Sequence, residues 1–590
     1  MTPVRLAAAA ALVTILGVCP ASGQGLDDSL RNSVARGCTG NKSVIIRTRP
    51  GARETLRKSL VSQGRRVNSE FPSLDALAAD VRCDDLKTLA GFGQTVSVSD
   101  NATVHGHQSS MESGWGRLTE ALSAQQLQAN LFSTLGVRQS LLGTLARYAM
   151  PQVGVAIIDS GIEPGPDFGT RITAFYDFTR GDIRPAAPSD QYGHGTHVAG
   201  LVGGTYVGVA PSARLIGLKV LDGQGQGTTD NVIRAIEFAI VNKNVLNIDV
   251  INLSLGHPIF ESAATDPLVQ AVEHASRAGI VVVVSAGNAG RNPKTGQVGH
   301  GGISSPGNAP SGISVGSLRT FDTVSRKDDR IAAYSSRGPS RYDRFAKPDI
   351  SAPGDNLLSV AATGSTLRLA QERRGNVGNY MRLSGTSMAA GVVSGMVALI
   401  LQTNQGLTPN ALKMVLQYSS IPVKNDDNSP VSDVLSHGAG SVNGGGALAL
   451  ARGINPMLAI GQKWLVARVT PATVIGGQTY VWAQRMVWGN HVALGPGIID
   501  EQRPSWALNI VWGEGLDDDD NIVWGNLFDD DDNIVWGNLF GDDDNIVWGN
   551  MLDDDDNIVW GNLFEDDDNI VWGNSALLGS VVNLVQKGVN

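Results

Sequence analysis

Four runs of apolar residues between positions 153 and 288 constrain the fold of this chain more than any other feature. VGVAIIDSG, ARLIGLKVL, DVINLSLG and GIVVVVSAGN have the length of strands but no polar alternation, which is typical of parallel strands covered on both faces. NVIRAIEFAIV, PLVQAVEHASRAG and the apolar run after Ser387 supply helices between or after them. We therefore predict a doubly wound α/β domain over residues 108–453, with functional residues in loops at the carboxyl ends of its strands.

The N-terminus differs from the rest of the chain. MTPVR carries a basic residue, LAAAAALVTILGV is a short apolar core, and ASG offers small residues for cleavage, so residues 1–23 are predicted to be a secretory signal peptide. No later segment is long and apolar enough to anchor the chain, and we expect a secreted or extracytoplasmic protein without a membrane span. Once the signal and its Cys19 are removed, Cys38 and Cys83 remain and can form a disulfide in an oxidising compartment.

Residues 24–107 are predicted to form a small α+β domain of their own. Two helices that cross a small antiparallel sheet correspond to a ferredoxin-like fold. His105 and His107 end this region in a polar stretch with a glycine, which we interpret as an exposed linker. The predicted strands are KSVIIRT, RRVNSEF, LDALAADV and TVSVSD, and the predicted helices are PGARETLRKSLVSQG and CDDLKTLAG.

From residue 454 the composition changes and a unit of 12 residues recurs. We expect a linker over 454–508, an acidic tryptophan repeat over 509–574 and a C-terminal tail over 575–590. NIVWG alternates with LFDDDD-like spacers, and its copies begin at Asn509, Asn521, Asn533, Asn545, Asn557 and Asn569.

These repeats hold much of the negative charge of the chain. Residues 517–574 contain 18 Asp, one Glu and no basic residue, against a formal net charge of −10 for the whole chain. Ile, Val and Trp favour strands, so the segment is predicted to be either β-rich or a disordered acidic tail. Its carboxylates suit Ca²⁺, although the spacing lacks the glycine and the closing glutamate of an EF-hand. A calcium-dependent β-array, surface binding and self-association through Trp stay open as alternatives.

Three short motifs in the central domain place a carboxylate, an imidazole and a hydroxyl at strand ends or helix starts. Asp159 follows a buried strand in VAIIDSGI, His194 lies in QYGHGTHVAG, and Ser387 lies in SGTSMAA ahead of an apolar helix. A serine hydroxyl becomes a good nucleophile when a neutral imidazole takes its proton, and a buried carboxylate orients that imidazole. The chain order Asp, His, Ser is one of the orders known for such triads, and we predict that these residues form one.

Together with VINLSLG, SAGNAG, YSSRGP, KPDISAPG and GAGSVNGGGALALA, these motifs make the chain resemble the subtilisin-like serine proteases over residues 130–453. The resemblance implies that Asp159 orients the imidazole, that His194 is the general base and that Ser387 is the nucleophile. It also implies that the side chain of Asn288 and the backbone N–H of Ser387 bind the oxyanion.

The same resemblance predicts how a substrate is held. The family binds an extended peptide as an added strand between two edges of the protein, where glycine lets the backbones approach closely. The residues similar to these edges are Gly225, Gln226 and Gly227 on one side and Ser254, Leu255 and Gly256 on the other.

Residues 24–107 resemble the inhibitor-like propeptides of these proteases. The chain is then expected to block its own cleft as an intramolecular inhibitor until it is cut between His105 and Ser113. His197, the second histidine of HGTH, is expected to be a packed helix residue.

No cofactor is required for the predicted chemistry. The segment LVGGTY is shorter than in relatives that wrap a calcium ion there, so we expect that calcium site to be absent. Asp167 matches a calcium-ligand position of the family without its partners and stays unassigned. The metal expected to bind, if any, is Ca²⁺ in the acidic repeats.

The predicted function is that of a secreted serine endopeptidase made as a zymogen. Its partners are protein or peptide substrates and its own propeptide, and we expect no nucleic-acid partner. The alternative is a non-catalytic surface or binding protein that uses a protease-like scaffold to present the Trp repeats. Labelling by a serine-directed phosphonate discriminates between the two.

Overall fold

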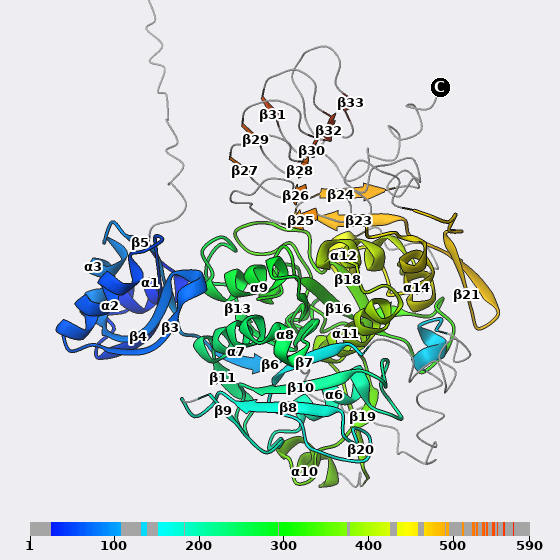
Figure 1. The fold of residues 1–590 in the computed structure, drawn as a ribbon, viewed down its shortest axis with the longest axis horizontal. Helices are drawn as coiled ribbons and strands as arrows, with labels where there is room; N and C mark the ends of the chain where they lie inside the picture. The colour runs from blue at the N-terminus through cyan, green and yellow to red at the C-terminus, as the bar shows by residue number, and fades with distance from the viewer. Residues whose placement is uncertain are drawn as a thin grey trace, which may run out of the picture.

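The computed structural model of the chain shows two packed domains followed by a stack of short strands (Figure 1). The predicted signal peptide 1–23, the segment 108–113, the Asp-rich spacers and the tail 575–590 lie outside the described residues. The described residues are 25–107, 131–137, 152–181, 183–292, 294–373, 378–424, 433–457, 465–489, 491–494 and short strands between 510 and 571.

The N-terminal domain is built on one five-stranded sheet. Its elements are β1 (Gly25–Leu26), α1 (Asp28–Ala35), β2 (Asn41–Thr48), α2 (Arg53–Ser62), β3 (Arg66–Phe71), β4 (Ala76–Arg82), α3 (Leu86–Ala90) and β5 (Thr95–Asp100), with 3₁₀ turns η1 (Pro72–Leu74) and η2 (Cys83–Asp85). The strand order is β1-β5-β2-β4-β3. β2 is antiparallel to both β4 and β5, and β3 is antiparallel to β4. The next strand, β6 (Thr103–Gly106), is not part of this sheet and pairs instead with strands of the second domain.

The alternation of side chains along β2 divides the two faces of this sheet between two cores. Val44 and Ile46 pack with Leu56 of α2 in the core of the N-terminal domain. Ile45, which points to the opposite face, belongs to a buried cluster formed largely by the second domain. The N-terminal sheet therefore covers the second domain with the face that its own helices leave open.

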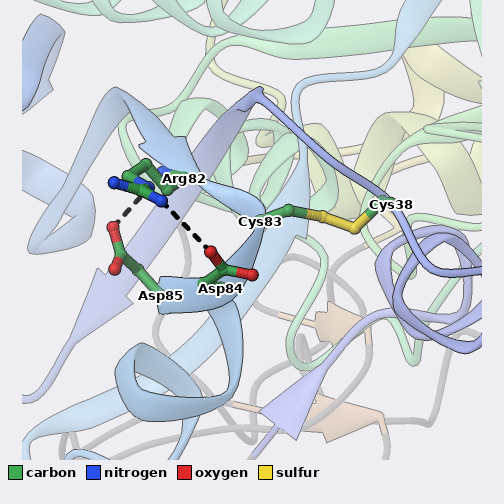
Figure 2. The surroundings of a disulfide bond; sticks show 5 residues. All are labelled: Cys38, Arg82, Cys83, Asp84 and Asp85. Carbon is green, nitrogen blue, oxygen red and sulfur yellow. Dashed lines mark hydrogen bonds and ion pairs between the residues drawn. A yellow bond between two sulfur atoms is a disulfide. The ribbon is translucent and has the colours of Figure 1, made fainter.

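Cys38 and Cys83, which we expected to pair, form a disulfide (Figure 2). Their Cα atoms lie 6.0 Å apart although they are separated by 45 positions in the chain. The bond joins the loop before β2 to the turn after β4, where Arg82 pairs with Asp84. It closes one end of the N-terminal domain.

The second domain is built on a nine-stranded sheet. Its strands are β7 (Gly154–Asp159), β8 (Ile172–Asp177), β9 (Arg184–Pro185), β10 (Arg214–Lys219), β12 (Val250–Leu253), β14 (Val281–Ser285), β16 (Ile313–Arg319), β17 (Arg330–Ile331) and β18 (Ile350–Pro353). They lie in the order β17-β16-β14-β12-β7-β10-β8-β9, with β18 beside β16. All contacts among β8, β10, β7, β12, β14, β16 and β18 are parallel. The four apolar runs of the sequence are the central strands β7, β10, β12 and β14.

Helices cover both faces of this sheet. They are α6 (His194–Gly203), α7 (Thr229–Val241), α8 (Lys243–Leu246), α9 (Pro267–Arg277), α10 (Thr366–Glu372), α11 (Thr386–Thr403), α12 (Pro409–Tyr418), α13 (Val434–His437) and α14 (Gly444–Gly453). Val155 and Ile157 of β7 share a core with α6, α11, α12 and α14, whereas Ala156 and Ile158 pack with α7 and α9. The predicted doubly wound α/β architecture is confirmed.

One helix among the described residues, α11, has the length and hydropathy of a membrane span, but 94% of it is buried inside the second domain. Its apolar surface is thus covered by the protein itself, on every side of the helix.

The strand order reverses at β7, because β10 lies on one side of it and β12 on the other. Ligands bind at the carboxyl ends of strands beside such a reversal. β7 ends at Asp159, β12 ends just before Ser254, and β14 ends shortly before Asn288. The topology therefore gathers the predicted site residues at one edge.

The short strands there are β11 (Gln226–Thr228), β13 (Leu255–Pro258) and β15 (Ser304–Ser305), and a separate hairpin joins β19 (Leu357–Val360) to β20 (Tyr380–Leu383).

Part of the predicted linker 454–508 is folded onto the second domain. β21 (Ala472–Ile475) pairs with β22 (Gln478–Val481), and β23 (Arg485–Trp488) pairs with β24 (His491–Leu494). Trp482, between the hairpins, is 3% exposed and packs edge-on against Tyr418. The linker prediction is wrong over 472–488, because these residues contribute apolar side chains to the core of the domain.

The repeats form two stacks of short parallel strands. Each NIVWG unit contributes one strand to the larger of the two sheets. This strand pairs in register with the corresponding residues of the units 12 positions before and after it. The larger sheet contains β25 (Ile510–Trp512), β26 (Ile522–Trp524), β28 (Ile534–Trp536), β30 (Ile546–Trp548), β32 (Ile558–Trp560) and β33 (Ile570–Val571), and the smaller one contains β27 (Leu527–Phe528), β29 (Leu539–Phe540) and β31 (Met551–Leu552).

Candidate active site

The carboxylate of Asp159 and the imidazole of His194 meet at the carboxyl end of β7. His194 Nδ1 lies 2.8 Å from Asp159 Oδ1 and 2.9 Å from Oδ2, and both side chains are fully buried. Burial alone lowers the pKa of His194, but the charge and hydrogen bond of Asp159, together with the charge of Asp190, raise it above its ordinary value. With its proton held on Nδ1 by Asp159, the neutral ring presents Nε2 as a proton acceptor.

A second buried carboxylate, Asp190, fixes the turn that precedes His194. Its Oδ1 accepts hydrogen bonds from Ser160 Oγ and from the backbone N–H of Gly193, both at 2.8 Å. Its Oδ2 accepts from the backbone N–H of Thr196 at 2.8 Å and from the hydroxyl of the same residue at 2.7 Å. One carboxylate thus ties the end of β7 to the first turn of α6. Sequence reasoning missed Asp190, because a lone Asp four positions before a motif carries no signal by itself.

Ser387 lies in the first turn of α11 and is fully buried. Its hydroxyl donates a hydrogen bond to the backbone oxygen of Ser254 at 2.9 Å, and the hydroxyl of Ser254 donates to the backbone oxygen of Ser387 at 3.0 Å. His194 Nε2 has no hydrogen-bond partner among the described atoms. The hydroxyl of Ser387 is therefore held by Ser254 rather than by the imidazole.

Asn288 follows β14 and is oriented by the residue before Ser387. Its Oδ1 accepts hydrogen bonds from the backbone N–H and the hydroxyl of Thr386, both at 3.0 Å. Within the part of the chain that the structure describes, the buried Nδ2 of Asn288 has no partner. The amide thus points its oxygen at α11 and keeps its two N–H donors available.

The two predicted substrate edges hold a strand of the chain itself. β6 lies between β11 and β13 and is antiparallel to both. Residue by residue, Thr103 pairs with Thr228, Val104 with Gly227, His105 with Gln226 and Gly256, and Gly106 with Leu255.

The residue after this strand, His107, reaches the end of α11. Its carbonyl oxygen accepts a hydrogen bond from the backbone N–H of Ser387 at 3.3 Å, and its own N–H donates to the oxygen of Ser254 at 3.1 Å. A Cβ on the preceding Gly106 would lie 3.2 Å from the His194 ring, so the chain passes close to the imidazole there. The carbonyl of His107 is thus presented to the residues predicted to act on it.

The prediction that His105 and His107 belong to an exposed linker is wrong as to the linker and as to the exposure of His107, whereas the His105 side chain is exposed as expected. His105 is part of β6, and the His107 ring is partly buried with its Nδ1 2.7 Å from the hydroxyl of Ser285. A polar, Gly-containing stretch resembles a linker when it is considered alone, and only the groove of the second domain gives it partners. Alternating residues around Val104, which is fully buried, were the one available signal of a strand.

His197 and Asp167 lie near the site without joining it. The His197 ring is buried, with Nε2 3.2 Å from the oxygen of Leu357 and 3.1 Å from that of Met381, and burial lowers its pKa to about 3. Asp167 accepts hydrogen bonds from the Tyr380 hydroxyl at 2.7 Å and from a backbone N–H at 3.2 Å. Its carboxylate is therefore engaged within the protein.

The described residues contain no cluster of three or more His, Cys, Asp or Glu side chains able to hold a metal ion. The spacers in which we expected Ca²⁺ are outside those residues.

Comparison with known proteins agrees with this geometry. The sequence profile of the subtilase family, Peptidase_S8, matches residues 151–442. Subtilisin E of Bacillus subtilis (strain 168) is 32% identical to this chain over 352 residues, which are 58% of this chain and 75% of that protein. This chain belongs to the subtilase family. The subtilase profile covers all four residues of the site, which are Asp159, His194, Asn288 and Ser387.

A further relative and one solved structure are also similar to this chain. Serine protease AprX of Bacillus subtilis (strain 168) is 41% identical over 303 residues, 49% of this chain and 65% of that protein, so the match spans less than two thirds of that relative. Fervidolysin from Fervidobacterium pennivorans, a keratinolytic enzyme related to subtilisin, superposes with a TM-score of 0.54 at 22% identity over 72% of this chain and 63% of its own. This likeness shows a shared fold.

Proposed function

We propose that this subtilase is a secreted serine endopeptidase, made as a zymogen, that hydrolyses peptide bonds through an acyl-enzyme. The observation that carries the proposal is the position of its own residues 103–107, which lie as a strand between β11 and β13 with the His107 carbonyl bonded to the N–H of Ser387. A peptide carbonyl is thus held at the N-terminal end of α11, where the helix dipole and backbone N–H groups favour negative charge.

In the proposed reaction the hydroxyl of Ser387 turns from Ser254 to His194 Nε2 and loses its proton to that nitrogen as Oγ attacks the carbonyl carbon. The carbonyl oxygen becomes negative and is stabilised by the N–H of Ser387 and by Nδ2 of Asn288. The imidazolium, stabilised by Asp159, returns the proton to the leaving amine, and an acyl-enzyme remains. Water then repeats the sequence, releasing the carboxylic acid and restoring the serine.

The N-terminal domain is proposed to act as the intramolecular inhibitor of this site. It contacts the second domain beyond β6: Arg47 donates to the oxygen of Ala264 at 2.9 Å, and Ser97 donates to the oxygen of Thr265 at 3.2 Å. Cleavage after His107 would leave these contacts and the β6 pairing in place. The released strand would therefore stay bound as a product inhibitor until the domain is removed.

Secretion is supported by the sequence of residues 1–23 and by the Cys38–Cys83 disulfide. Disulfides of this kind form in oxidising compartments outside the cytoplasm. The peptide and protein substrates proposed for the mature enzyme would enter the same groove as β6.

Expression of the full chain and of its Ser387→Ala variant, each alone, tests this function. We expect the unmodified chain to be cut between His107 and Gln108 and the variant to stay uncut. A serine-directed phosphonate should label Ser387 in the mature protein. Ser314→Ala is the matched control and should mature normally. It also removes a buried hydroxyl, but this hydroxyl has no hydrogen-bond partner among the described atoms.

Two results would contradict the proposal. If the Ser387→Ala chain is cut at the same bond, another protease performs the maturation. If the phosphonate labels no residue of the unmodified protein, the alternative of a non-catalytic scaffold that presents the Trp repeats is favoured.

A further inference from the structure

The side chain of His107 occupies a pocket whose chemistry is specific. Its Nδ1 lies 2.7 Å from the hydroxyl of Ser285, the last residue of β14 and fully buried. The opposite wall is the backbone of Gly256, where a Cβ would lie 2.7 Å from Cε1 and 3.1 Å from Nε2 of the ring. The pocket therefore accepts a flat ring against a wall without a side chain and offers it one buried hydroxyl.

The Ser285 hydroxyl matches either tautomer of the neutral ring. When its hydrogen is directed at the backbone oxygen of Leu253, 3.4 Å away, its oxygen accepts a hydrogen bond from Nδ1–H. In the other tautomer the hydroxyl donates to the lone pair of Nδ1. The pocket thus suits a side chain with a neutral ring nitrogen at this position.

The surroundings favour the uncharged form of the ring. Burial is the largest cause that lowers the pKa of His107 to about 3, and the neighbouring His194, His257 and His105 contribute to this shift. A neutral imidazole meets no charge penalty in this pocket, whereas a protonated side chain would lose its hydration without gaining an anionic partner from these groups.

We infer that Ser285 is a specificity-determining residue, and that the mature enzyme cleaves preferentially after neutral histidine, whose Nδ1 the Ser285 hydroxyl recognises by a hydrogen bond. The inference rests on the proposed endopeptidase function and names its substrate class: peptides with histidine on the acyl side of the cut bond. An aliphatic side chain would leave the buried hydroxyl with a single, long hydrogen bond.

The test uses the mature enzyme obtained from the full chain and two peptides that differ in one residue, His or Leu, before the cleaved bond. At pH 8 we expect kcat/KM to be higher for the His peptide, and Ser285→Ala to reduce the His-to-Leu ratio by about threefold to tenfold, the effect of one hydrogen bond. Ser314→Ala is the matched control and should leave the ratio unchanged. The ratio should also fall at pH 5.5, because free histidine is then largely protonated.

An unchanged ratio in Ser285→Ala, or a preference of the unmodified enzyme for the Leu peptide, overturns the specificity and leaves the proposed function intact. Failure of the unmodified enzyme to cut any peptide or protein overturns both. If Ser285→Ala yields no active enzyme, the rate of self-cleavage in the precursor is measured instead. His107→Leu should slow self-cleavage more in the chain that keeps Ser285 than in a Ser285→Thr chain, because the bulkier threonine disturbs the pocket. Equal slowing in the two chains contradicts the inference.

Discussion

Replacement of Trp482 by alanine measures how far residues 472–488 belong to the protease domain. The indole is 3% exposed, its ring centroid lies 6.2 Å from that of Tyr418 in an edge-on contact, and its Nε1–H donates to the Thr473 hydroxyl at 2.8 Å. Truncation of a buried aromatic side chain costs about 3–5 kcal/mol, to which the lost hydrogen bond adds about 1 kcal/mol. We expect the free energy of unfolding to fall by about 5 kcal/mol.

The assay is urea unfolding followed by far-UV circular dichroism, in a Ser387→Ala background that prevents self-digestion. With a denaturant dependence of about 3 kcal/mol per molar urea, the midpoint should fall by about 1.7 M. Val481→Ala is the control, because the side chain of Val481, the last residue of β22 and the neighbour of Trp482 in the chain, is 64% exposed and its truncation should change stability by less than about 0.5 kcal/mol. Equal midpoints for Trp482→Ala and Val481→Ala would refute the assignment of this segment to the core.

Four further predictions concern the site and the disulfide. Asn288→Ala should lower kcat by about 10²–10³ with little change in KM, since the amide acts on the oxyanion and not on the bound substrate; steady-state kinetics on one peptide checks this. The rate should rise with pH through a pKa above 6.5, because only neutral His194 accepts the proton and Asp159 holds its pKa above that ordinary value. Asp159→Asn should lower kcat by about 10⁴ and move the midpoint of the pH–rate profile downward; a profile that does not move would contradict the stated cause of the shift. Replacement of both Cys38 and Cys83 by serine should destabilise the N-terminal domain by about 4 kcal/mol, since it opens a loop of 45 residues, and hydrogen exchange in β2 and β4 should increase accordingly.

The N-terminal domain shows where local signals suffice and where they were overlooked. Strands β2, β3, β4 and β5 and the helices α2 and α3 follow from periodicity and from turn residues, whereas the two-residue strand β1 does not. Helix α1 was not predicted, although Asp27 caps it by accepting a hydrogen bond from the N–H of Leu30 at 2.7 Å. A polar N-cap before a short helix is a weak signal when the helix buries a single leucine.

The sequence by itself determined the doubly wound domain and the identity of the residues at its carboxyl edge. Continuous apolar runs are buried wherever they occur, and the motifs around Asp159, His194 and Ser387 lie at strand ends and helix starts that the same runs define. These are local properties of the chain, and each of them can be recognised within a short segment of the sequence.

Only the tertiary structure decided what His107, Ser285 and Trp482 do. His107 meets Ser285 across 178 positions of the chain, and Trp482 packs on a helix that ends at Tyr418. Neither contact leaves a pattern in its own segment, because a polar stretch and an isolated tryptophan gain partners only when distant surfaces are brought together. The groove between β11 and β13 converts a linker-like sequence into a strand, since it supplies the backbone hydrogen bonds that the segment cannot make alone.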